Sequence, residues 1–486
     1  MSTQLQFLTP ELVDRILDEA FQLLLEPGVQ VQSPKAKALL ASAGAQVDQA
    51  SGVTRIPESI VRQALATVPK EFDLYNQAGA PAVHYGGNQV HFDPGSSGVN
   101  MLDPETLEHY PAQTADLVRL VQVAENLPQY AAQSTAVVCN EVPKVIGDLY
   151  RLYLVLLYSA KPVVTGAFAI PTTDTMFEML ALYAGGREAL AQKPRAIFDI
   201  CPTPPLIWSD FGASGLIALA RAGVPAQIVS MPLAGAAGPV TLLGSVVQHA
   251  AETLSGITIH QLAGPGSPIV WGGAPAIFDM RHGTTPMGAI ETALIDASYA
   301  QVGKSLGLPT HAYLGASDAK IVDAQAGLES GLTALVGAQA GINMVSGAGM
   351  LDFLACQSAE KLVIDAEGIA MAQRLLTGIQ VQTETLATEL FTGIDFKADF
   401  LKQKITRQLF RKEQYLPSAV IERGSLREWQ ANGALDTFAR ARMRVQELTS
   451  TYQRPAADPA LERELHKMVA SLAQSAGMIK LPPLNL

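Results

Sequence analysis

The stretch that decides the fold runs from residue 226 to residue 271. It begins with a run of strand length, Ala226-Gln-Ile-Val-Ser-Met231. It continues through a long apolar segment of helical length, Thr241–Leu262, and ends in a second short run, Pro268-Ile-Val-Trp271. A strand, a crossover helix and a second strand place the two strands parallel in one sheet, with the helix against its face. This stretch therefore predicts a parallel sheet that is covered by helices.

The same alternation extends in both directions along the chain. Runs of strand length occur at Ser134–Cys139, Pro162–Phe168, Ala196–Cys201, Ala226–Met231, Pro268–Trp271, Pro309–Leu314, Ile342–Val345 and Lys361–Ile364. Helical segments lie between them, among them Thr173–Tyr183, Asp210–Ala222, Thr241–Leu262 and Ala289–Leu306. Eight such units predict a closed (β/α)8 TIM barrel. A doubly wound open sheet is the competing fold, but no Gly-x-Gly-x-x-Gly follows the first strand, which disfavours its dinucleotide-binding version.

The segments on either side of this pattern differ from it, and we divide the chain into three parts. Residues 1–112 predict an N-terminal α+β extension, whose first helix has Thr9 as its N-cap and Pro10 in its first turn. Further helices are expected at Ser33–Ala43 and Pro57–Ala66, with strands at Phe72–Asn76 and Val83–Phe92. Residues 113–378 predict the barrel. Residues 379–486 predict a helical C-terminal region packed on it, with helices at Thr383–Leu390, Asp399–Phe410, Ser425–Thr449 and Asp458–Gly477.

Composition excludes several classes of protein. The 486 residues are 48% hydrophobic and only 16% charged, which is the opposite of a disordered chain. A net charge of −11 without a basic cluster excludes nucleic acid as a partner. The densest basic stretch, Lys402 to Lys412, is expected to be a solvated or partner-facing surface. The large apolar fraction and the helical tail predict a homo-oligomer.

The cellular setting is predicted from three further features. Only three cysteines occur, at Cys139, Cys201 and Cys356, and their wide spacing favours a reducing compartment over a disulfide framework. The first residues lack the basic and apolar regions of a signal peptide. No run of 18 apolar residues indicates a membrane span. We therefore expect a cytoplasmic protein with no membrane partner.

The loops that follow the strands contain the candidate chemistry, because a barrel places its site at the carboxyl ends of its strands. One cluster of ionisable residues stands out there: Asp279, Arg281, His282, Asp318, Lys320, Asp323 and Glu329. No serine or cysteine nucleophile lies beside a base motif, no histidines have metal spacing, and no P-loop is present. The chain therefore shows no covalent or metal mechanism of its own, which fits chemistry supplied by a bound group.

The same loops are rich in small residues. Small residues permit either tight packing of the barrel or close approach of a large rigid ligand. Because these loops converge on one face, we favour the second interpretation. The candidates for contact with such a group are Gly235, Gly238, Gly272, Gly273, Gly315, Ser317, Gly347 and Gly349.

At this point a family resemblance is visible over nearly the whole chain. The sequence resembles the trimethylamine methyltransferase family of corrinoid-dependent enzymes. The matching stretches, in order, are Gly28-Val29, Ala43–Asp48, Ile56-Pro57, Gly235–Thr241, Ala251-Glu252, Gln261-Leu262, Pro265–Pro268, Asp279–Arg281, Gly307–Pro309, Ser317–Lys320, Asp323–Gly327, Glu329, Glu360–Asp365, Arg411–Glu413, Pro417 and Trp429.

The resemblance implies a reaction and a branch of the family. Members move a methyl group from a methylated amine to the cobalt of a separate corrinoid protein, so no permanently bound cofactor and no metal ligand are expected in this chain. Members that act on trimethylamine carry pyrrolysine, expected after the sixth strand, whereas Leu314–Lys320 here contains ordinary residues. This points to the branch lacking pyrrolysine, similar to glycine betaine methyltransferase. The family often has a His-Thr pair near Leu401; Ile405-Thr406 stands here, so a role for that histidine is in doubt.

The chemistry of this branch needs few protein groups. A quaternary ammonium leaves as a neutral tertiary amine after in-line attack by Co(I), so no general acid is required. The enzyme must hold the cation, align one methyl group and exclude water. Aromatic faces and negative charge hold such cations. We assign Asp279, Asp318 and Lys320 as catalytic candidates, and Phe168, Phe198, Trp271, Tyr313, Arg281, His282 and Phe353 as substrate-binding candidates, the basic ones for a carboxylate tail.

Two other functions stay open alongside the methyltransferase. One is a lyase or aldolase that uses Lys320 as a Schiff base. The other is a barrel that binds a betaine without turning it over. Among methyl donors, glycine betaine, proline betaine, carnitine and γ-butyrobetaine all fit the residues.

Overall fold

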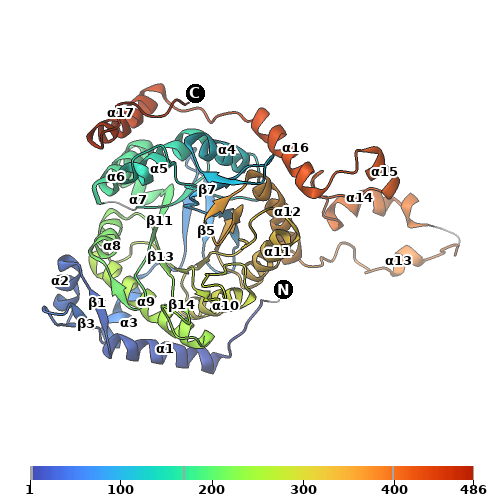
Figure 1. Cartoon of the computed structure of the whole chain (residues 1–486). Helices are drawn as coiled ribbons and strands as arrows, with labels where there is room; N and C mark the ends of the chain where they lie inside the picture. The colour runs from blue at the N-terminus through green and yellow to red at the C-terminus, as the bar shows by residue number, and fades with distance from the viewer. Residues whose placement is uncertain (1–3, 168–169, 397–398, 485–486) are drawn as a thin grey trace.

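The computed structural model describes residues 4–167, 170–396 and 399–484 and is built around eight parallel strands (Figure 1). These strands are β6 (His91–Pro94), β9 (Gln133–Ser134), β10 (Val163–Gly166), β11 (Ala196–Ile200), β13 (Ala226–Ser230), β15 (Ile269–Gly273), β17 (His311–Ala312) and β18 (Met344–Ala348). Hydrogen bonds join them as β9-β10-β11-β13-β15 and as β17-β18-β6.

Two further contacts close these rows into a ring. Trp271 and Thr310 form a parallel bridge between β15 and the start of β17. On the other side the Ala131 amide donates to the Phe92 carbonyl at 2.9 Å, and Gly98 bridges Val137, so β6 and β9 run side by side. An open doubly wound sheet would have two unpaired edges. We call the closed set of eight strands the strand ring.

Seven of the predicted strands have a counterpart in the strand ring, although Ser134–Cys139 overlaps β9 only at Ser134, and the eighth was wrong. Lys361–Ile364 lies in α12 (Ala359–Leu376), whose first turn is capped by the Ser358 hydroxyl, which accepts from the Lys361 amide. The cap outweighs the strand-like Val363-Ile364 pair. The missing strand is β6, which the sequence placed at the end of a strand in the extension. The strand ring thus takes its strands from residues 91–348, across the boundary predicted at residue 112.

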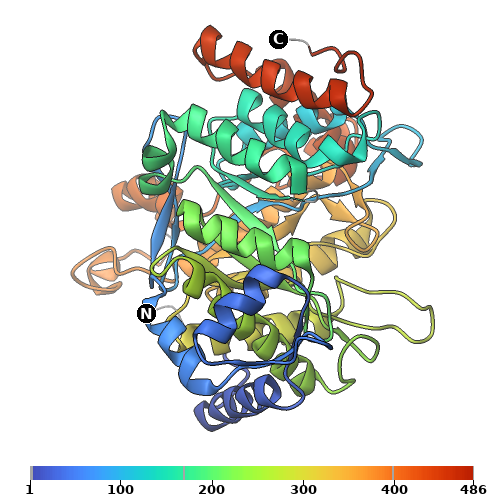
Figure 2. The ribbon, with the colours of Figure 1, turned by 90° about the vertical axis from the view of Figure 1, so that its left-hand side faces the viewer.

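Helices surround the strand ring, as Figures 1 and 2 show. They are α4 (Thr114–Glu125), α5 (Gly147–Tyr158), α6 (Ile170–Ala184), α7 (Arg187–Gln192), α8 (Asp210–Ala222), α9 (Leu242–Ala263), α10 (Ile290–Ser305), α11 (Ala324–Gln339) and α12, with the short η1 (Lys144–Ile146) before α5. Side chains alternate across each strand. Phe198 meets Phe177 of α6 at 5.4 Å between ring centroids, so its neighbours Ile197 and Asp199 face the interior.

The N-terminal extension covers the outside of α9. It contains α1 (Pro10–Leu25), α2 (Pro34–Ser42) and α3 (Glu58–Thr67), with strands β1 (Val29–Val31), β2 (Gln46–Val47) and β3 (Val53–Arg55), next to β12 (Ile207–Trp208). Helices α1, α2 and α3 pack on α9, so residues 245–261 of that helix are buried on all sides. This explains why α9 is apolar along its length rather than on one stripe.

A hairpin closes the amino end of the strand ring. It consists of β4 (Phe72–Tyr75) and β5 (Pro81–Tyr85). Leu74, Val83 and Tyr85 of this hairpin form one buried cluster with inward residues of the strands, Ala132, Val164, Ile197, Val270 and Met344. The interior is therefore a packed core at this end, and only the carboxyl end is left for chemistry.

Short strands and loops rim the carboxyl end. β7 (Asn100–Leu102) and β8 (His109–Pro111) join β19 (Met350–Leu351) and β20 (Cys356–Gln357), and β14 (Leu233–Ala234) pairs with β16 (Ala276–Ile277). None of the described helices has the length and apolar character needed to cross a lipid bilayer.

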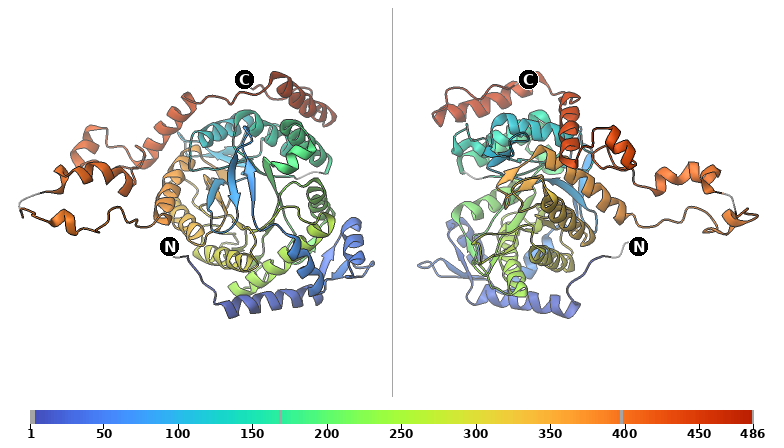
Figure 3. Two further views of the ribbon diagram at one scale, coloured as in Figure 1. Left: turned by 180° about the vertical axis from the view of Figure 1, so that it is seen from behind. Right: turned by 45° about the vertical axis from the view of Figure 1, so that its right-hand side comes forward.

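The C-terminal region divides into a segment that leaves the body and one that packs on it (Figures 1 and 3). The first contains α13 (Thr388–Phe391), η2 (Phe400–Lys402), α14 (Lys404–Glu413) and α15 (Leu426–Ala431). The second contains α16 (Thr437–Ser450), on α12 and α4, and α17 (Pro459–Ser475), on α5 and α6. The single helix predicted at Ser425–Thr449 is two, because Asp436 caps a new helix after the turn at Gly433.

Candidate functional site

A layer of polar side chains lies inside the strand ring, directly above the packed core. Its members lie within the strands of the ring or, for Ser96 and Tyr313, shortly after a strand. They are Asp93, Ser96, Asp199, Gln227, His311, Tyr313 and Ser346, which we call the inner polar layer.

Hydrogen bonds organise this layer around two carboxyl groups. Tyr313 donates its hydroxyl to Asp199 Oδ2 at 3.0 Å, and the Gln227 amide donates to Asp199 Oδ1 at 2.7 Å. The Tyr313 hydroxyl also lies 2.9 Å from Ser96 Oγ. On the other side the Ser346 hydroxyl donates to Asp93 and lies 3.1 Å from His311 Nε2. The hydrogen bonds thus form two groups, one around Asp199 and one around Asp93, and the rings of His311 and Tyr313 meet between them at 5.1 Å.

The charge of the layer is only partly compensated. Burial raises the pKa of Asp199 to about 7, against the opposing effect of its hydrogen bonds from Tyr313 and Gln227. Burial also raises the pKa of Asp93 well above its usual range, and the charge of Asp199 raises it further. His311 does not supply a counter-charge, because burial lowers its pKa to about 3. At neutral pH the layer therefore holds protons where a cation could stand instead.

Two buried atoms of the layer have no hydrogen-bond partner among the described residues. They are Asp93 Oδ2 and His311 Nδ1. Buried polar atoms are nearly always paired, and exceptions gather at binding and catalytic sites. The inner polar layer is therefore our candidate binding site, and its two carboxyl groups would favour a positively charged ligand.

An apolar cluster adjoins this layer at Tyr313. Ala274 and Met287 are buried with Tyr313, the partly buried Leu354 packs against them, and we call this cluster the roof. Asp318 holds the roof from the side, because its carboxylate accepts from the Met287 amide at 2.8 Å and the Gly288 amide at 3.0 Å. Burial raises the pKa of Asp318 to about 6 despite these bonds. Asp318 is thus a positioning residue for the roof.

A second contact fixes the Leu354 side of the roof. Lys320 Nζ lies 2.9 Å from Asp352 Oδ1 and 3.6 Å from the centroid of the Phe353 ring. Asp352, Phe353 and Leu354 have φ values of 50°, 56° and 68°, so the backbone of three consecutive residues is left-handed. Such a backbone persists only where its surroundings impose it. We call the Lys320 contacts with Asp352 and Phe353 the clasp.

The predicted ionisable residues do come together, but outside the roof. A cleft of about 850 Å³ on the rim has Asp279, Arg281, His282, Asp318, Lys320 and Phe353 in its lining, together with Glu291 and Glu329. We call it the rim cleft. Its charges largely pair with one another: Arg281 Nη2 lies 2.7 Å from Asp279 Oδ2 and holds the pKa of that carboxyl well below its usual range. His282 Nδ1 lies 3.3 Å from the same oxygen.

Of the predicted aromatic faces, only Tyr313 lies in the inner polar layer. Phe353 belongs to the clasp. The predictions for Phe198 and Trp271 were wrong, because both point out of the strand ring toward helices: Phe198 meets Phe177, and Trp271 donates to the Tyr299 carbonyl at 3.0 Å. Val270 and Gly272 take the inward positions beside Trp271. Phe168 lies outside the described residues.

Most of the predicted cofactor contacts are instead positions of close packing. A side chain at Gly272 would meet the Ile228 carbonyl at 2.7 Å, and one at Gly347 would meet the backbone of Leu314. Gly273 packs on His249, Gly349 on Gln357 and Gly238 on Gln248, while Gly235 faces Met280 on the rim. Gly315 has φ +85°, and the Ser317 hydroxyl donates to Glu329 at 2.6 Å. The open space inferred from Gly272, Gly273, Gly347 and Gly349 was wrong.

Sequence reasoning missed Asp93, Ser96, Asp199, Gln227, His311 and Ser346. It searched the loops after the strands, whereas most of these residues lie within them. A signal was present: Asp199 is a carboxylate inside the apolar run Ala196–Ile200, at an inward position by strand alternation. Asp93 stands likewise in the short run His91–Pro94.

No three His, Cys, Asp or Glu side chains in residues 4–167, 170–396 and 399–484 gather closely enough to hold a metal ion. The three cysteines are free thiols; Cys139 and Cys356 are buried.

Comparisons with known proteins identify the family. The sequence model of the trimethylamine methyltransferase family matches residues 2–477. A trimethylamine methyltransferase of Methanosarcina mazei is 33% identical over 96% of this chain and 95% of its own. The glycine betaine methyltransferase of Desulfitobacterium hafniense is 28% identical over 97% of this chain and 98% of its own.

A solved structure supports the fold. The monomethylamine methyltransferase of Methanosarcina barkeri aligns over 98% of this chain and 90% of its own, with a TM-score of 0.51 at 11% identity. With the family match and the relatives over nearly the full length, the conclusion is that this chain belongs to the trimethylamine methyltransferase family.

Proposed function

We propose that this protein transfers a methyl group from a quaternary amine of the glycine betaine type to the Co(I) of a corrinoid carried by a partner protein. The strand ring is then a (β/α)8 TIM barrel, with the N-terminal extension and the C-terminal region as its additions, and its site lies at the carboxyl end. The family supplies the class of reaction, a methyl transfer. The quaternary substrate and the corrinoid acceptor are our proposal.

The observation that carries the proposal is the pair of buried carboxyl groups in the inner polar layer. Asp93 and Asp199 are buried near each other, and burial raises the pKa of both. A quaternary ammonium group has a fixed charge and no proton to lose. Placed above Asp199, it would stabilise the Asp199 carboxylate and take the place of the proton that this group binds in the free protein.

The remaining residues of the layer have distinct tasks in this account. The Tyr313 ring offers its face to the cation, and its hydroxyl keeps Asp199 in place at 3.0 Å. The roof of Ala274, Met287 and Leu354 excludes water from the methyl group. Because the leaving group is a neutral tertiary amine, no residue has to donate a proton. This agrees with a layer in which His311 is neutral, its pKa being lowered to about 3.

The surface around the rim cleft suits the corrinoid that accepts the methyl group. When bound, the corrinoid supplies the cobalt nucleophile that takes the methyl group. Exposed apolar side chains line the rim cleft, among them Val240 and Met280. A surface of this kind fits the apolar edge of a large planar ring. Arg281 and His282 line the same cleft, outside the roof, and both contact Asp279.

The Schiff-base alternative is disfavoured by the surroundings of Lys320. Its ammonium group is held by the Asp352 carboxylate at 2.9 Å and donates to the Asp318 carbonyl at 2.6 Å. Both contacts stabilise the charged amine, whereas a Schiff-base lysine must be neutral to attack a carbonyl.

The proposal is tested by adding cob(I)alamin, or the cob(I)amide form of a candidate partner, and following its absorbance as it is methylated. The panel contains glycine betaine, proline betaine, carnitine, γ-butyrobetaine and trimethylamine. We expect methylation with at least one quaternary amine and none with trimethylamine. Transfer from trimethylamine alone would refute the substrate class. Binding of a betaine without transfer to any corrinoid would identify a binding protein instead.

A further inference from the structure

The inner polar layer is closed to solvent on one side and open on another. Its closed members, each almost fully shut off from solvent, are Asp93, Gln227, His311 and Ser346. Asp199 and Ser96 lie in the same layer but are partly accessible. The Tyr313 hydroxyl lies within hydrogen-bond distance of both, at 3.0 Å from Asp199 Oδ2 and 2.9 Å from Ser96 Oγ. Solvent, and with it a small ligand, therefore reaches the layer on the Asp199 side.

The strand register shows which residues line this open side. The parallel strands β11 and β13 pair Asp199 with Gln227. Because side chains alternate along a strand, Cys201 is the next inward position above Asp199, with Val229 beside it. Val229 belongs to the same buried cluster as the roof residues. Met231 is the following inward position on the β13 side. Cys201 and Met231 are both exposed.

The neighbours of these two residues point the other way, as alternation requires. Ile200 packs against α8, and the Ser230 hydroxyl donates to Glu252 of α9 at 2.7 Å. Both helices lie outside the strand ring (Figure 1). The exposed side chains of Cys201 and Met231 thus face the interior of the ring at its carboxyl end and bound an opening above Asp199.

The thiol of Cys201 is accessible and yet deep in the molecule. Burial raises its pKa to about 12, and the negative charge of Asp199 raises it further. A thiol on the outer surface keeps a pKa near its ordinary value. Exposure and a raised pKa occur together where a side chain lines the wall of a concave opening. The effect of Asp199 also agrees with the strand register, which places the two side chains on one face of β11.

We propose that the opening bounded by Cys201 and Met231 is the route by which the quaternary amine reaches Asp199, and that the bound ammonium group lies against the Cys201 thiol. Sulfur side chains are polarisable and behave as small apolar groups, which suits N-methyl groups that cannot donate a hydrogen bond. The buried atoms Asp93 Oδ2 and His311 Nδ1, in the same layer, have no partner among the described residues. This inference rests on the proposed function, because it places the cation on Asp199.

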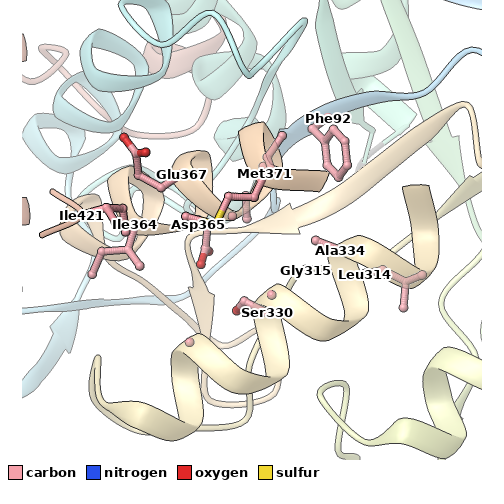
Figure 4. Close-up of a pocket in the computed structure, with 15 residues that line it drawn as sticks. Phe92, Leu314, Gly315, Ser330, Ala334, Ile364, Asp365, Glu367, Met371 and Ile421 are labelled. Carbon is pink, nitrogen blue, oxygen red and sulfur yellow. The ribbon is translucent and has the colours of Figure 1, made fainter. Parts of the chain in front are cut away.

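A second pocket offers a cation less. It has a volume of about 220 Å³ and lies between α11 and α12, where Figure 4 shows Asp365 and Ser330. Its buried carboxylates already have partners. Lys361 Nζ lies 2.6 Å from Asp365 Oδ2 and donates to the Ser330 hydroxyl at 2.6 Å. The Glu367 carboxylate accepts from the Tyr415 hydroxyl at 2.6 Å. This pocket therefore serves as the control region in the test below.

The test uses the three thiols of the full-length protein. N-ethylmaleimide at pH 8, followed by peptide mass spectrometry, should modify Cys201 first, because Cys139 and Cys356 are buried. The variant Asp199→Asn should speed this modification. Asp199 has a pKa of about 7 and is largely ionised at pH 8, its charge raises the pKa of the thiol, and the thiolate is the reactive form. Modification of a buried cysteine ahead of Cys201, or an unchanged rate in Asp199→Asn, would overturn the placement.

Protection by the amine then tests the route. An amine of the panel that binds by calorimetry, added at about 20 times its dissociation constant, should slow the modification of Cys201 about 20-fold, because only the free protein reacts. For glycine betaine the matched control ligand is 3,3-dimethylbutanoate, which has carbon in place of the quaternary nitrogen. It has no positive charge and should give no protection at the same concentration.

A variant that fills the opening completes the test. Cys201→Phe should weaken amine binding at least about tenfold. Gly331→Phe is the matched control: it places the same ring in the pocket of Figure 4, where a side chain would meet nothing within 4 Å, and should leave binding unchanged. Thermal unfolding checks that both variants fold. An amine that binds without slowing the modification, and binds Cys201→Phe equally well, would overturn this inference alone. Absence of binding by every amine of the panel would instead refute the proposed function, and this inference with it.

Discussion

The inner polar layer and the rim cleft contain similar residues in opposite states. In the cleft, Asp279 is bound by Arg281, and its pKa is held well below the usual range. In the layer, burial raises the pKa of Asp199 to about 7, and no cationic side chain faces it among the contacts described. A carboxylate that is already paired with an arginine has little net charge left to attract a ligand. A buried carboxyl group without such a pairing can still attract one, and our proposal therefore puts the substrate cation in the layer.

The largest expected effect comes from removing the charge of the layer. Asp199→Asn keeps the size of the side chain but cannot balance a buried cation. We expect kcat/KM for the quaternary amine to fall at least about 100-fold, the consequence of losing about 3 kcal/mol of ionic interaction. The matched change in the cleft, Asp279→Asn, should lower it by less than about threefold, since that pair is exposed. Steady-state kinetics on both variants compares the two regions directly.

Equal losses in these two variants would remove the distinction between layer and cleft. Circular dichroism and thermal unfolding are the controls for folding, because Asp199 accepts bonds from Gln227 and Tyr313 that a variant rearranges.

The second-largest effect is expected from the aromatic ring of Tyr313. Tyr313→Leu should raise KM about 30-fold, because a desolvated cation–π contact is worth about 2 kcal/mol. Tyr313→Phe keeps the ring and loses only the hydroxyl bonds to Asp199 and Ser96, so a smaller increase is expected. Inhibition by tetramethylammonium measures the same contact without turnover. An unchanged affinity in Tyr313→Leu would mean that the cation does not meet this ring.

The roof is expected to respond in stability as well as activity. Asp318→Ala leaves the Met287 and Gly288 amides without their acceptor, which should cost about 1–3 kcal/mol in the free energy of unfolding. KM should rise more than kcat falls, because the roof covers the cation without touching the cobalt. Urea denaturation and kinetics measure both. Asp318→Asn, which retains one acceptor oxygen, should recover part of each loss.

The clasp should give the smallest effect. Lys320 is half-exposed, so Lys320→Met removes an ion pair worth at most about 1 kcal/mol. We expect no more than a threefold change in kcat/KM. Borohydride trapping of the wild-type protein with carbonyl compounds, followed by mass spectrometry, should show no adduct at Lys320. A trapped adduct would restore the lyase interpretation.

The sequence predicted the parallel strands well because each is an apolar run set between helices with clear caps. Ser209 before α8 and Thr241 before α9 are such caps, and both accept a backbone amide in the structure. It failed at β6, where the short run His91–Pro94 contains Asp and Pro, and at Lys361–Ile364, where a helix cap competes with β-branched residues.

The site was harder to predict, and the reasons are physical. Strand alternation alone decides that Trp271 faces helices while Gly272 faces the interior, and one residue of register reverses the assignment. The partners of Asp199 are Gln227 of β13 and Tyr313 after β17, both far from it in the chain. Their convergence, and with it the raised pKa of Asp199, depends on the closed ring.

The central claim is that a cation replaces a proton on Asp199 of the inner polar layer. Isothermal titration calorimetry with the preferred quaternary amine at pH 7, without corrinoid, tests it in buffers of different ionisation enthalpy. Because the free protein has Asp199 with a pKa of about 7 and a bound cation lowers that pKa, binding should release roughly half a proton, and less at pH 8, where binding should be tighter. Asp199→Asn should abolish the release and Asp279→Asn should not. Binding without proton release, at an affinity unchanged in Asp199→Asn, would contradict the account.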